Sequence, residues 1–137
     1  MMLRRIFYTC MMAGVWGGCD GLDQVVVILE NNGEFPVEVD IYIADFQEIP
    51  EFLLTTTGEK IEMTVPAGGV STFLRSCDEL QAIIIESADL RVIGDVGPNS
   101  ETDVLRDGDD FGCGAILTFT FDHPDLPTSL DIKLNVL

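Results

Sequence analysis

Hydrophobic and polar side chains alternate along most of this chain after residue 24. Between residues 37 and 43, for example, Val37, Val39 and Ile41 alternate with Glu38 and Asp40. A period of two is typical of a strand, because successive side chains point to opposite faces. Continuous apolar runs fit strands that are buried on both faces. Together these patterns predict strands at 25–30, 37–43, 60–65, 70–77, 80–87, 90–93, 115–122 and 130–137.

Turn-forming residues separate these strands, and little in the sequence is typical of a helix. Asn, Gly and Pro residues mark turns at 31–33, 66–69 and 124–127. Residues 50–54 predict a single helical turn that begins at a proline, because three threonines and Gly58 disfavour a longer helix. Parallel neighbours would need crossover connections, for which the sequence offers no candidate. We therefore expect an all-β fold, an antiparallel β-sandwich of seven or eight strands, over residues 25–137.

Two local features resemble known small sandwiches. The opening pair of strands joined by an Asn-rich turn, and the Pro-Ala-Gly turn at 66–68, are similar to those of immunoglobulin-like and transthyretin-like proteins. The likeness is one of general topology, so it implies a sandwich and assigns no functional residue.

The first eighteen residues have the pattern of a secretory leader. Arg4 and Arg5 precede an apolar run at 6–16, and Gly17 and Gly18 follow it. Eleven apolar residues span only about 16 Å as a helix, roughly half of a bilayer core. The sequence therefore predicts a signal peptide at 1–18 rather than a membrane span, and the chain is expected to be exported.

Gly17, Gly18 and Cys19 resemble the end of a bacterial lipoprotein leader, although Trp16 stands where that family has an aliphatic residue. The resemblance implies that Cys19 is lipidated and becomes the first residue of the mature chain. Residues 19–24 would then be a short tether to a membrane of the cell envelope. The alternative is an ordinary secretory peptide, which leaves Cys19 free or removes it.

The negative net charge of the chain disfavours some classes of binding partner. The formal net charge is −17, and loss of Arg4 and Arg5 with the leader leaves 24 acidic and 5 basic residues, a charge of −19. Such a surface repels nucleic acid and anionic headgroups, and it suits a cation or a basic partner in the envelope. Because 47% of the residues are hydrophobic, the chain can bury a core and is not a disordered acidic segment.

Cys77 and Cys113 are the cysteines that remain after the leader and Cys19 are set aside. In an exported chain such a pair predicts one disulfide, which would stabilise the fold by about 4 kcal/mol. The two residues would meet if the strands at 70–77 and 115–122 were antiparallel neighbours. A zinc site is disfavoured, because the chain has no Cys-x-x-Cys motif and a single histidine.

The segment 101–114 contains the densest carboxylates and is the candidate metal site. Its possible calcium ligands are Asp103, Asp107, Asp109 and Asp110. The spacing does not match an EF-hand, because Gly114 stands where that loop requires an acid. The alternative is that these aspartates form turns on a solvated loop.

His123 is the other residue with catalytic chemistry, but no Gly-x-Ser-x-Gly motif accompanies it. A small hydrolase that uses His123 and acidic residues stays an alternative, as does a calcium-binding module. The favoured interpretation is an exported, lipid-anchored cell-envelope protein with a non-enzymatic binding or structural role and no resident cofactor.

Overall fold

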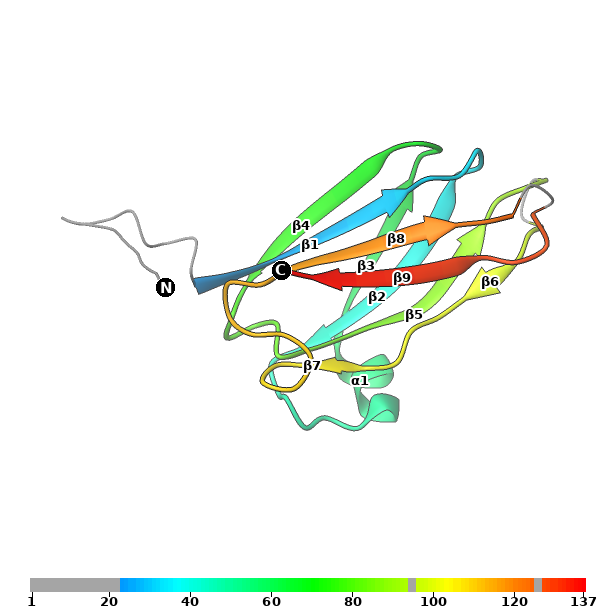
Figure 1. Cartoon of the computed structure of the whole chain (residues 1–137). Helices are drawn as coiled ribbons and strands as arrows, with labels where there is room; N and C mark the ends of the chain where they lie inside the picture. The colour runs from blue at the N-terminus through cyan, green and yellow to red at the C-terminus, as the bar shows by residue number, and fades with distance from the viewer. Residues whose placement is uncertain (1–22, 94–95, 125–126) are drawn as a thin grey trace, which may run out of the picture.

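The structure is a computed structural model that describes residues 23–93, 96–124 and 127–137. Two β-sheets face each other and enclose the core, with one short helix at one end (Figure 1). The predicted signal peptide at 1–18 and the predicted lipid site Cys19 lie outside the described residues. No helix in the described ranges is long and apolar enough to cross a membrane.

Sheet A has the strand order β4-β1-β8-β9. Its strands are β1 (Gln24–Asn31), β4 (Val70–Ser76), β8 (Ile116–Asp122) and β9 (Asp131–Val136). The prediction of a purely antiparallel sandwich is wrong, because β1 pairs antiparallel with β4 but parallel with β8. The crossover that a parallel pair requires is not a helix: the whole second sheet and β4 lie between β1 and β8 in the chain.

Sheet B has the order β3-β2-β5-β6, and β7 also pairs with β5. Its strands are β2 (Val37–Ala44), β3 (Glu59–Val65), β5 (Ala82–Leu90), β6 (Asn99–Ser100) and β7 (Leu105–Arg106). The described part of the chain thus has nine strands rather than seven or eight. Two of them, each two residues long, lie in a segment expected to be a loop. The predicted strand at 90–93 is not separate, since β5 continues to Leu90 past an irregularity opposite Asp40–Ile41.

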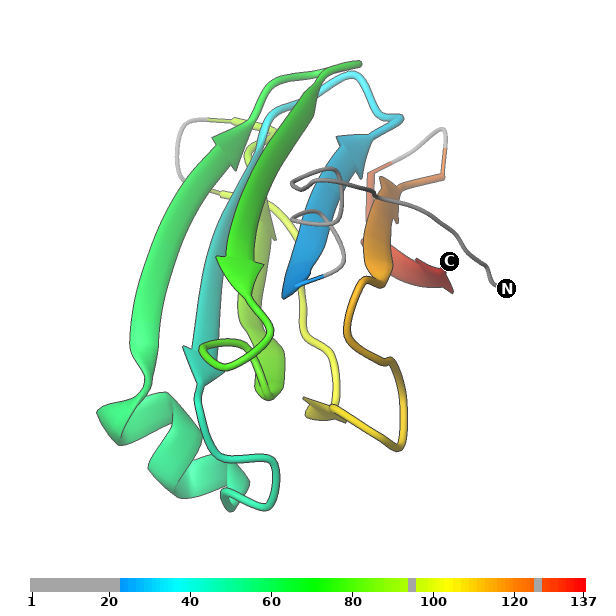
Figure 2. The same cartoon turned by 90° about the vertical axis from the view of Figure 1, so that its left-hand side faces the viewer.

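The core lies between the inner faces of the two sheets. Every second residue of β1, β2 and β8 is buried, as the period-two pattern of β2 and β8 predicts. In β1, the continuous apolar run does not mean burial on both faces, because Val26 and Ile28 are only partly buried. Phe119 and Phe121 of β8 are fully buried and are the largest side chains in this core. Each sheet therefore also has an outer face, formed by the alternate residues. Figure 2 shows the two sheets edge-on, with the helix beside the end of sheet B.

Helix α1 (Glu51–Thr57) is longer than the single turn predicted. It begins after Pro50 and continues to Thr57, and the hydroxyls of Thr56 and Thr57 donate hydrogen bonds to the carbonyls four residues earlier. The buried Leu54 packs on the outer face of sheet B. It forms a second apolar cluster, which we call the helix-covered cluster, with Ile49, Ala82 and Ile84.

The predicted disulfide is present between Cys77 and Cys113, whose Cα atoms are 5.4 Å apart. The expected reason for their meeting is wrong, because β4 and β8 are not neighbours: β1 lies between them. The bridge lies beside the start of β1, and the Cys77 amide donates a hydrogen bond to the Asp23 carbonyl there at 2.8 Å. It therefore holds the same end of three strands together.

Candidate functional site

The predicted calcium ligands are spread along the segment 101–114. Asp110 uses a carboxylate oxygen to accept a hydrogen bond from the Arg106 backbone amide at 2.8 Å. Gly108, with φ of 87°, closes the turn by donating to the Phe111 carbonyl, and Phe111 is buried. Among the residues that the structure describes, no three His, Cys, Asp or Glu side chains gather in a way that could hold a metal ion. Calcium binding by Asp103, Asp107, Asp109 and Asp110 stays a prediction.

Arg106 connects this segment to the segment that covers sheet B. Its Nη1 donates hydrogen bonds to the carbonyls of Gln47 at 2.7 Å and Ile49 at 2.8 Å. Charged donors make stronger hydrogen bonds than neutral ones. The guanidinium thus binds backbone carbonyls from a distant part of the chain. This contact could not be predicted from the sequence, because the residues lie far apart in it.

His123 has a structural role in this geometry. Its Nε2 accepts a hydrogen bond from the Glu34 amide at 3.1 Å, and its Nδ1 lies 2.8 Å from the Pro124 carbonyl. The ring packs so closely on the turn that a Cβ at Gly33 would lie 2.4 Å from its Cδ2 atom. Both ring nitrogens are therefore engaged by the backbone, and the side chain ties the end of β8 to the turn after β1.

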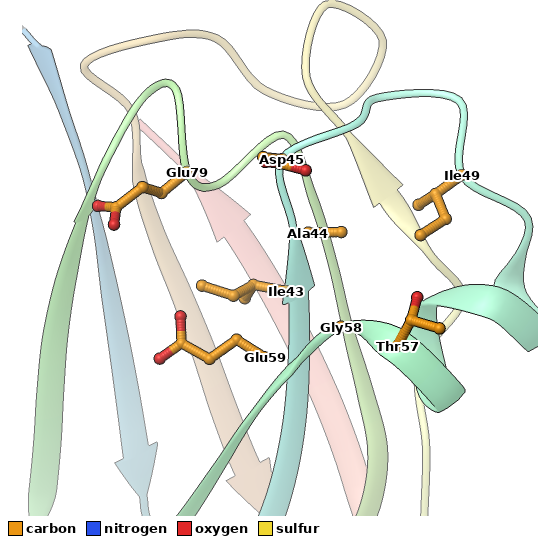
Figure 3. Close-up of a pocket in the computed structure, with 8 residues that line it drawn as sticks. All are labelled: Ile43, Ala44, Asp45, Ile49, Thr57, Gly58, Glu59 and Glu79. Carbon is orange, nitrogen blue, oxygen red and sulfur yellow. The ribbon is translucent and has the colours of Figure 1, made fainter.

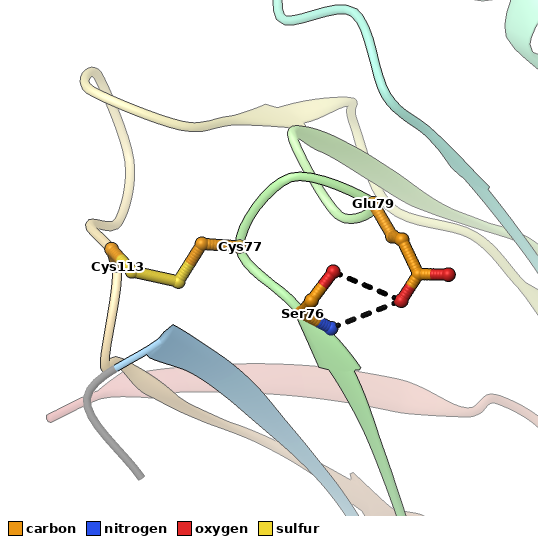
Figure 4. The surroundings of a disulfide bond; sticks show 4 residues. All are labelled: Ser76, Cys77, Glu79 and Cys113. Atoms are coloured by element: carbon orange, nitrogen blue, oxygen red, sulfur yellow. Dashed lines mark hydrogen bonds between the residues drawn. A yellow bond between two sulfur atoms is a disulfide. The ribbon is translucent and has the colours of Figure 1, made fainter. Parts of the chain in front are cut away.

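A first hollow, of about 330 Å³, lies where β2, α1 and β3 meet (Figure 3). The carboxylates of Asp45, Glu59 and Glu79 line it, but two of them already bind the chain. Glu59 pairs with Arg75 at 2.7 Å, and this hydrogen bond holds the pKa of Glu59 below its usual range. Glu79 accepts hydrogen bonds from the amide and hydroxyl of Ser76 (Figure 4). This hollow is consequently a weak candidate for a ligand site.

A second hollow, of about 340 Å³, is the better candidate, and we call it the β9 groove. Its lining combines carboxylates with apolar side chains: Glu101, Thr102, Asp103, Leu105, Phe119, Ile132 and Leu134. Ile132 and Leu134 face inward opposite Phe121 and Phe119, yet Leu134 is 39% exposed. The reason is that the facing strands of sheet B, β6 and β7, are only two residues long and leave this side of the sandwich open.

The acidic rim of the β9 groove is held in place through Thr102. Its backbone amide donates to the Ile85 carbonyl, and its hydroxyl accepts from the Ile85 amide, both at 3.0 Å. Because Thr102 is pinned to β5 in this way, Glu101 and Asp103 on either side of it are exposed. The rim therefore presents two carboxylates beside an apolar floor. Such a site can bind a chain segment that carries both apolar and basic side chains.

The β9 groove contains one of the four predicted metal ligands, Asp103, and not the other three. Sequence analysis missed Glu101, Ile132 and Leu134 as site residues. The alternation at 130–137 predicts a strand correctly, but it cannot show that the inner face of that strand lacks a full covering partner. The only sequence signal for the rim was the high density of acids that begins at Glu101.

Comparisons with known proteins leave the family open. No family model matches the chain, and no curated protein matches it. Among solved structures, an NMR structure of a protein from Eubacterium rectale is similar over 85% of this chain and 94% of that chain. The identity is 10% and the TM-score is 0.48.

Proposed function

We propose that this protein is exported, anchored to a cell-envelope membrane through lipidated Cys19, and binds an extended basic segment of an envelope partner in the β9 groove. The role is one of binding and involves no reaction. The observation that supports it best is the combination of an apolar floor with the carboxylates of Glu101 and Asp103 on the open side of the sandwich. The high negative charge supports a basic partner and disfavours nucleic acid.

The position of β9 supports binding of an extended segment. Within the described ranges β9 pairs with β8 alone, so its second edge has backbone groups available for another strand. An added strand would donate and accept main-chain hydrogen bonds along β9. Alternate side chains of that strand would reach Leu134 and Ile132 on one side, and basic side chains would reach the rim.

The anchor is supported by the leader pattern and by the short tether. Intact-mass measurement of the protein from membranes should find an acyl mass, and Cys19→Ser should release an unacylated protein into the soluble fraction. Equal solubility of both proteins without acyl mass would contradict the anchor and leave the groove proposal standing.

Binding in the β9 groove is tested with a blocked peptide of alternating lysine and valine, titrated by calorimetry. We expect Glu101→Gln with Asp103→Asn to weaken binding about fivefold, because exposed ion pairs contribute roughly 0.2–1 kcal/mol each. Leu134→Ser should weaken it further by removing part of the apolar floor.

The matched control is Asp40→Asn with Glu62→Gln, which removes two carboxylates from the outer face of sheet B. Affinity in this control should stay within about twofold of the unmodified protein, because these charges lie away from the groove. An equal loss in both double variants would show that the peptide follows overall charge, and the groove proposal would then be wrong.

A further inference from the structure

The outer face of sheet A carries a region of uncharged side chains at the end where β1 begins. The strand register places four apolar residues in one row across the sheet: Leu74, Val26, Ile116 and Leu137. The next row is also uncharged and consists of Thr72, Ile28, Thr118 and Asn135. We call these two rows the sheet A patch. Leu74 is 48% exposed and Leu137 is 75% exposed, while the apolar residues between them are half-buried.

The rest of the surface makes this patch unusual, because the chain is strongly acidic. Charged residues appear on the same face only from the third row, which contains Glu30 and Lys133. The outer face of sheet B carries Glu38, Asp40 and Glu62 at its middle and far rows. An uncharged surface of this kind on an acidic domain fits contact with an apolar or zwitterionic layer.

The chain reaches the patch directly from Cys19. Three residues separate Cys19 from Asp23, and the four steps of chain between the two Cα atoms span at most about 14 Å. Val26 lies about 10 Å further along the chain. Whatever Cys19 is attached to is therefore within a short distance of the first row of the patch.

We propose that the sheet A patch rests on the lipid surface to which Cys19 is anchored, an inference that rests on the proposed function. Leu74 and Leu137 enter the interface between headgroups and acyl chains, and the threonines of the second row lie at headgroup level. This orientation turns the acids of sheet B away from the membrane. Packed sheets lie about 10 Å apart, which is about one Debye length at physiological salt, so those charges are largely screened from the headgroups.

A second copy of this chain is a poorer occupant of the patch. Two mature chains would each bring a formal charge of −19 to one contact. A membrane that contains zwitterionic lipid brings no comparable repulsion. Among the strand residues of this face, the acid nearest to the patch is Glu30, which lies on the side farther from the anchor. At the anchor end, Asp23 precedes β1 and Glu79 accepts hydrogen bonds from Ser76.

The test uses a tryptophan placed on the patch. The sequence has one tryptophan, Trp16, and it lies in the predicted leader, so Leu74→Trp gives the mature chain a single fluorescent reporter. The full chain is expressed, and the membrane-purified protein is reconstituted into phosphatidylcholine vesicles with brominated acyl chains. Glu62→Trp is the matched control, because it lies on the outer face of sheet B at a similar distance from the 66–69 turn.

We expect quenching by brominated lipid to be roughly threefold stronger for Leu74→Trp than for Glu62→Trp, since only the first residue reaches the acyl boundary. Thr72→Trp, in the second row, should give an intermediate value and replaces Leu74→Trp if that variant does not fold. Equal quenching at the two faces would overturn the inference. So would an unquenched, blue-shifted Leu74→Trp in a protein of dimer mass, which would show a second copy on the patch.

Failure of the anchor is separated from failure of the patch by mass spectrometry of the same samples. If no acyl mass is present on Cys19, its thiol is coupled to a maleimide phospholipid, because Cys77 and Cys113 are joined to each other. Quenching of Leu74→Trp and of Glu62→Trp is then compared in the chemically anchored protein. Strong, selective quenching of Leu74→Trp after coupling supports the patch even when the natural anchor is absent.

Discussion

At the end of the sandwich where β1 begins, both sheets carry apolar side chains on their outer faces. Another segment of the chain covers these side chains on sheet B but not on sheet A. On sheet B, Ile84 is 3% exposed, because Leu54 of α1 and Ile49 pack over it. On sheet A, Leu74 and Leu137 remain exposed, and no other segment of the described residues covers them. The chain covers one apolar surface with its own helix and leaves the other exposed.

The difference also concerns how each surface is supported. The helix-covered cluster is held by packing and by Arg106, which binds the carbonyls of the covering segment. The sheet A patch is held by the disulfide: Leu74 lies three residues before Cys77, and Ile116 lies three residues after Cys113. No covering segment stabilises the exposed surface in the described residues, and the covalent bridge beside it stabilises that end of the sheet.

Removal of the disulfide should have the largest effect. Cys77→Ser with Cys113→Ser should lower the free energy of unfolding by about 4 kcal/mol, because the bridge closes a loop with a sequence separation of 36. Urea unfolding followed by circular dichroism measures this change. A loss of less than about 1 kcal/mol would show that the patch end is held by packing after all, as on sheet B.

Truncation of one leucine on each face is the direct comparison. Leu54→Ala should cost about 3 kcal/mol, because Leu54 is fully buried under the helix and a cavity would remain. Leu74→Ala should cost about 0.5 kcal/mol or less, since half of that side chain is already in water. Equal costs in urea unfolding would mean that the sheet A patch is covered in the free protein, contrary to the inference.

The ion pair between Glu59 and Arg75 joins the two regions and should have the smallest effect. Glu59 begins β3, one residue after the end of α1, and Arg75 is next to Leu74 in the chain. The Arg75 hydrogen bond lowers the pKa of Glu59 in the folded state, so the pair stabilises the fold above the ordinary glutamate pKa. That contribution is lost as the pH falls through the lowered pKa and the carboxylate is protonated.

Glu59 is about half exposed, so the pair should contribute only about 0.2–1 kcal/mol. Glu59→Gln should therefore be slightly less stable than the unmodified protein at about pH 7, and the difference should disappear as the pH falls through the lowered pKa of Glu59. If Glu59→Gln remains less stable than the unmodified protein at low pH, the lost stability comes from packing of the Glu59 side chain and not from the ion pair. Glu86→Gln, at an exposed glutamate of β5, is the matched control for the loss of one negative charge.

Local pattern was sufficient for much of the fold and for little of the site. Alternation at 37–43 and 115–122 predicted strands whose buried faces are Val37, Val39 and Leu117, because a period of two reports which side is buried. The cysteine count predicted the disulfide. The parallel pairing of β1 with β8 was not predictable from local pattern, since the chemistry of a strand does not depend on the direction of its neighbour.

The β9 groove shows why site residues are harder to predict. Ile132 and Leu134 look like core residues in the sequence, and they are partly exposed only because β6 and β7 are short. The acidic segment contributes Glu101 and Asp103 to the groove lining, but only Asp103 is one of the predicted calcium ligands. The hydrogen bond between Thr102 and Ile85 determines which acids lie beside the apolar side chains of the groove. These two residues are far apart in the chain.

The place of β1 between β4 and β8 also constrains the order of folding. Synthesis delivers β1 first, but its parallel partner β8 comes near the end of the chain. Long-range pairing of this kind is slow, because a large loop must close before the contact forms. Until β8 arrives, β1 has one edge and one apolar face unprotected, which is the condition in which strands aggregate. The nascent protein should therefore need a chaperone for longer than a sandwich built from consecutive hairpins.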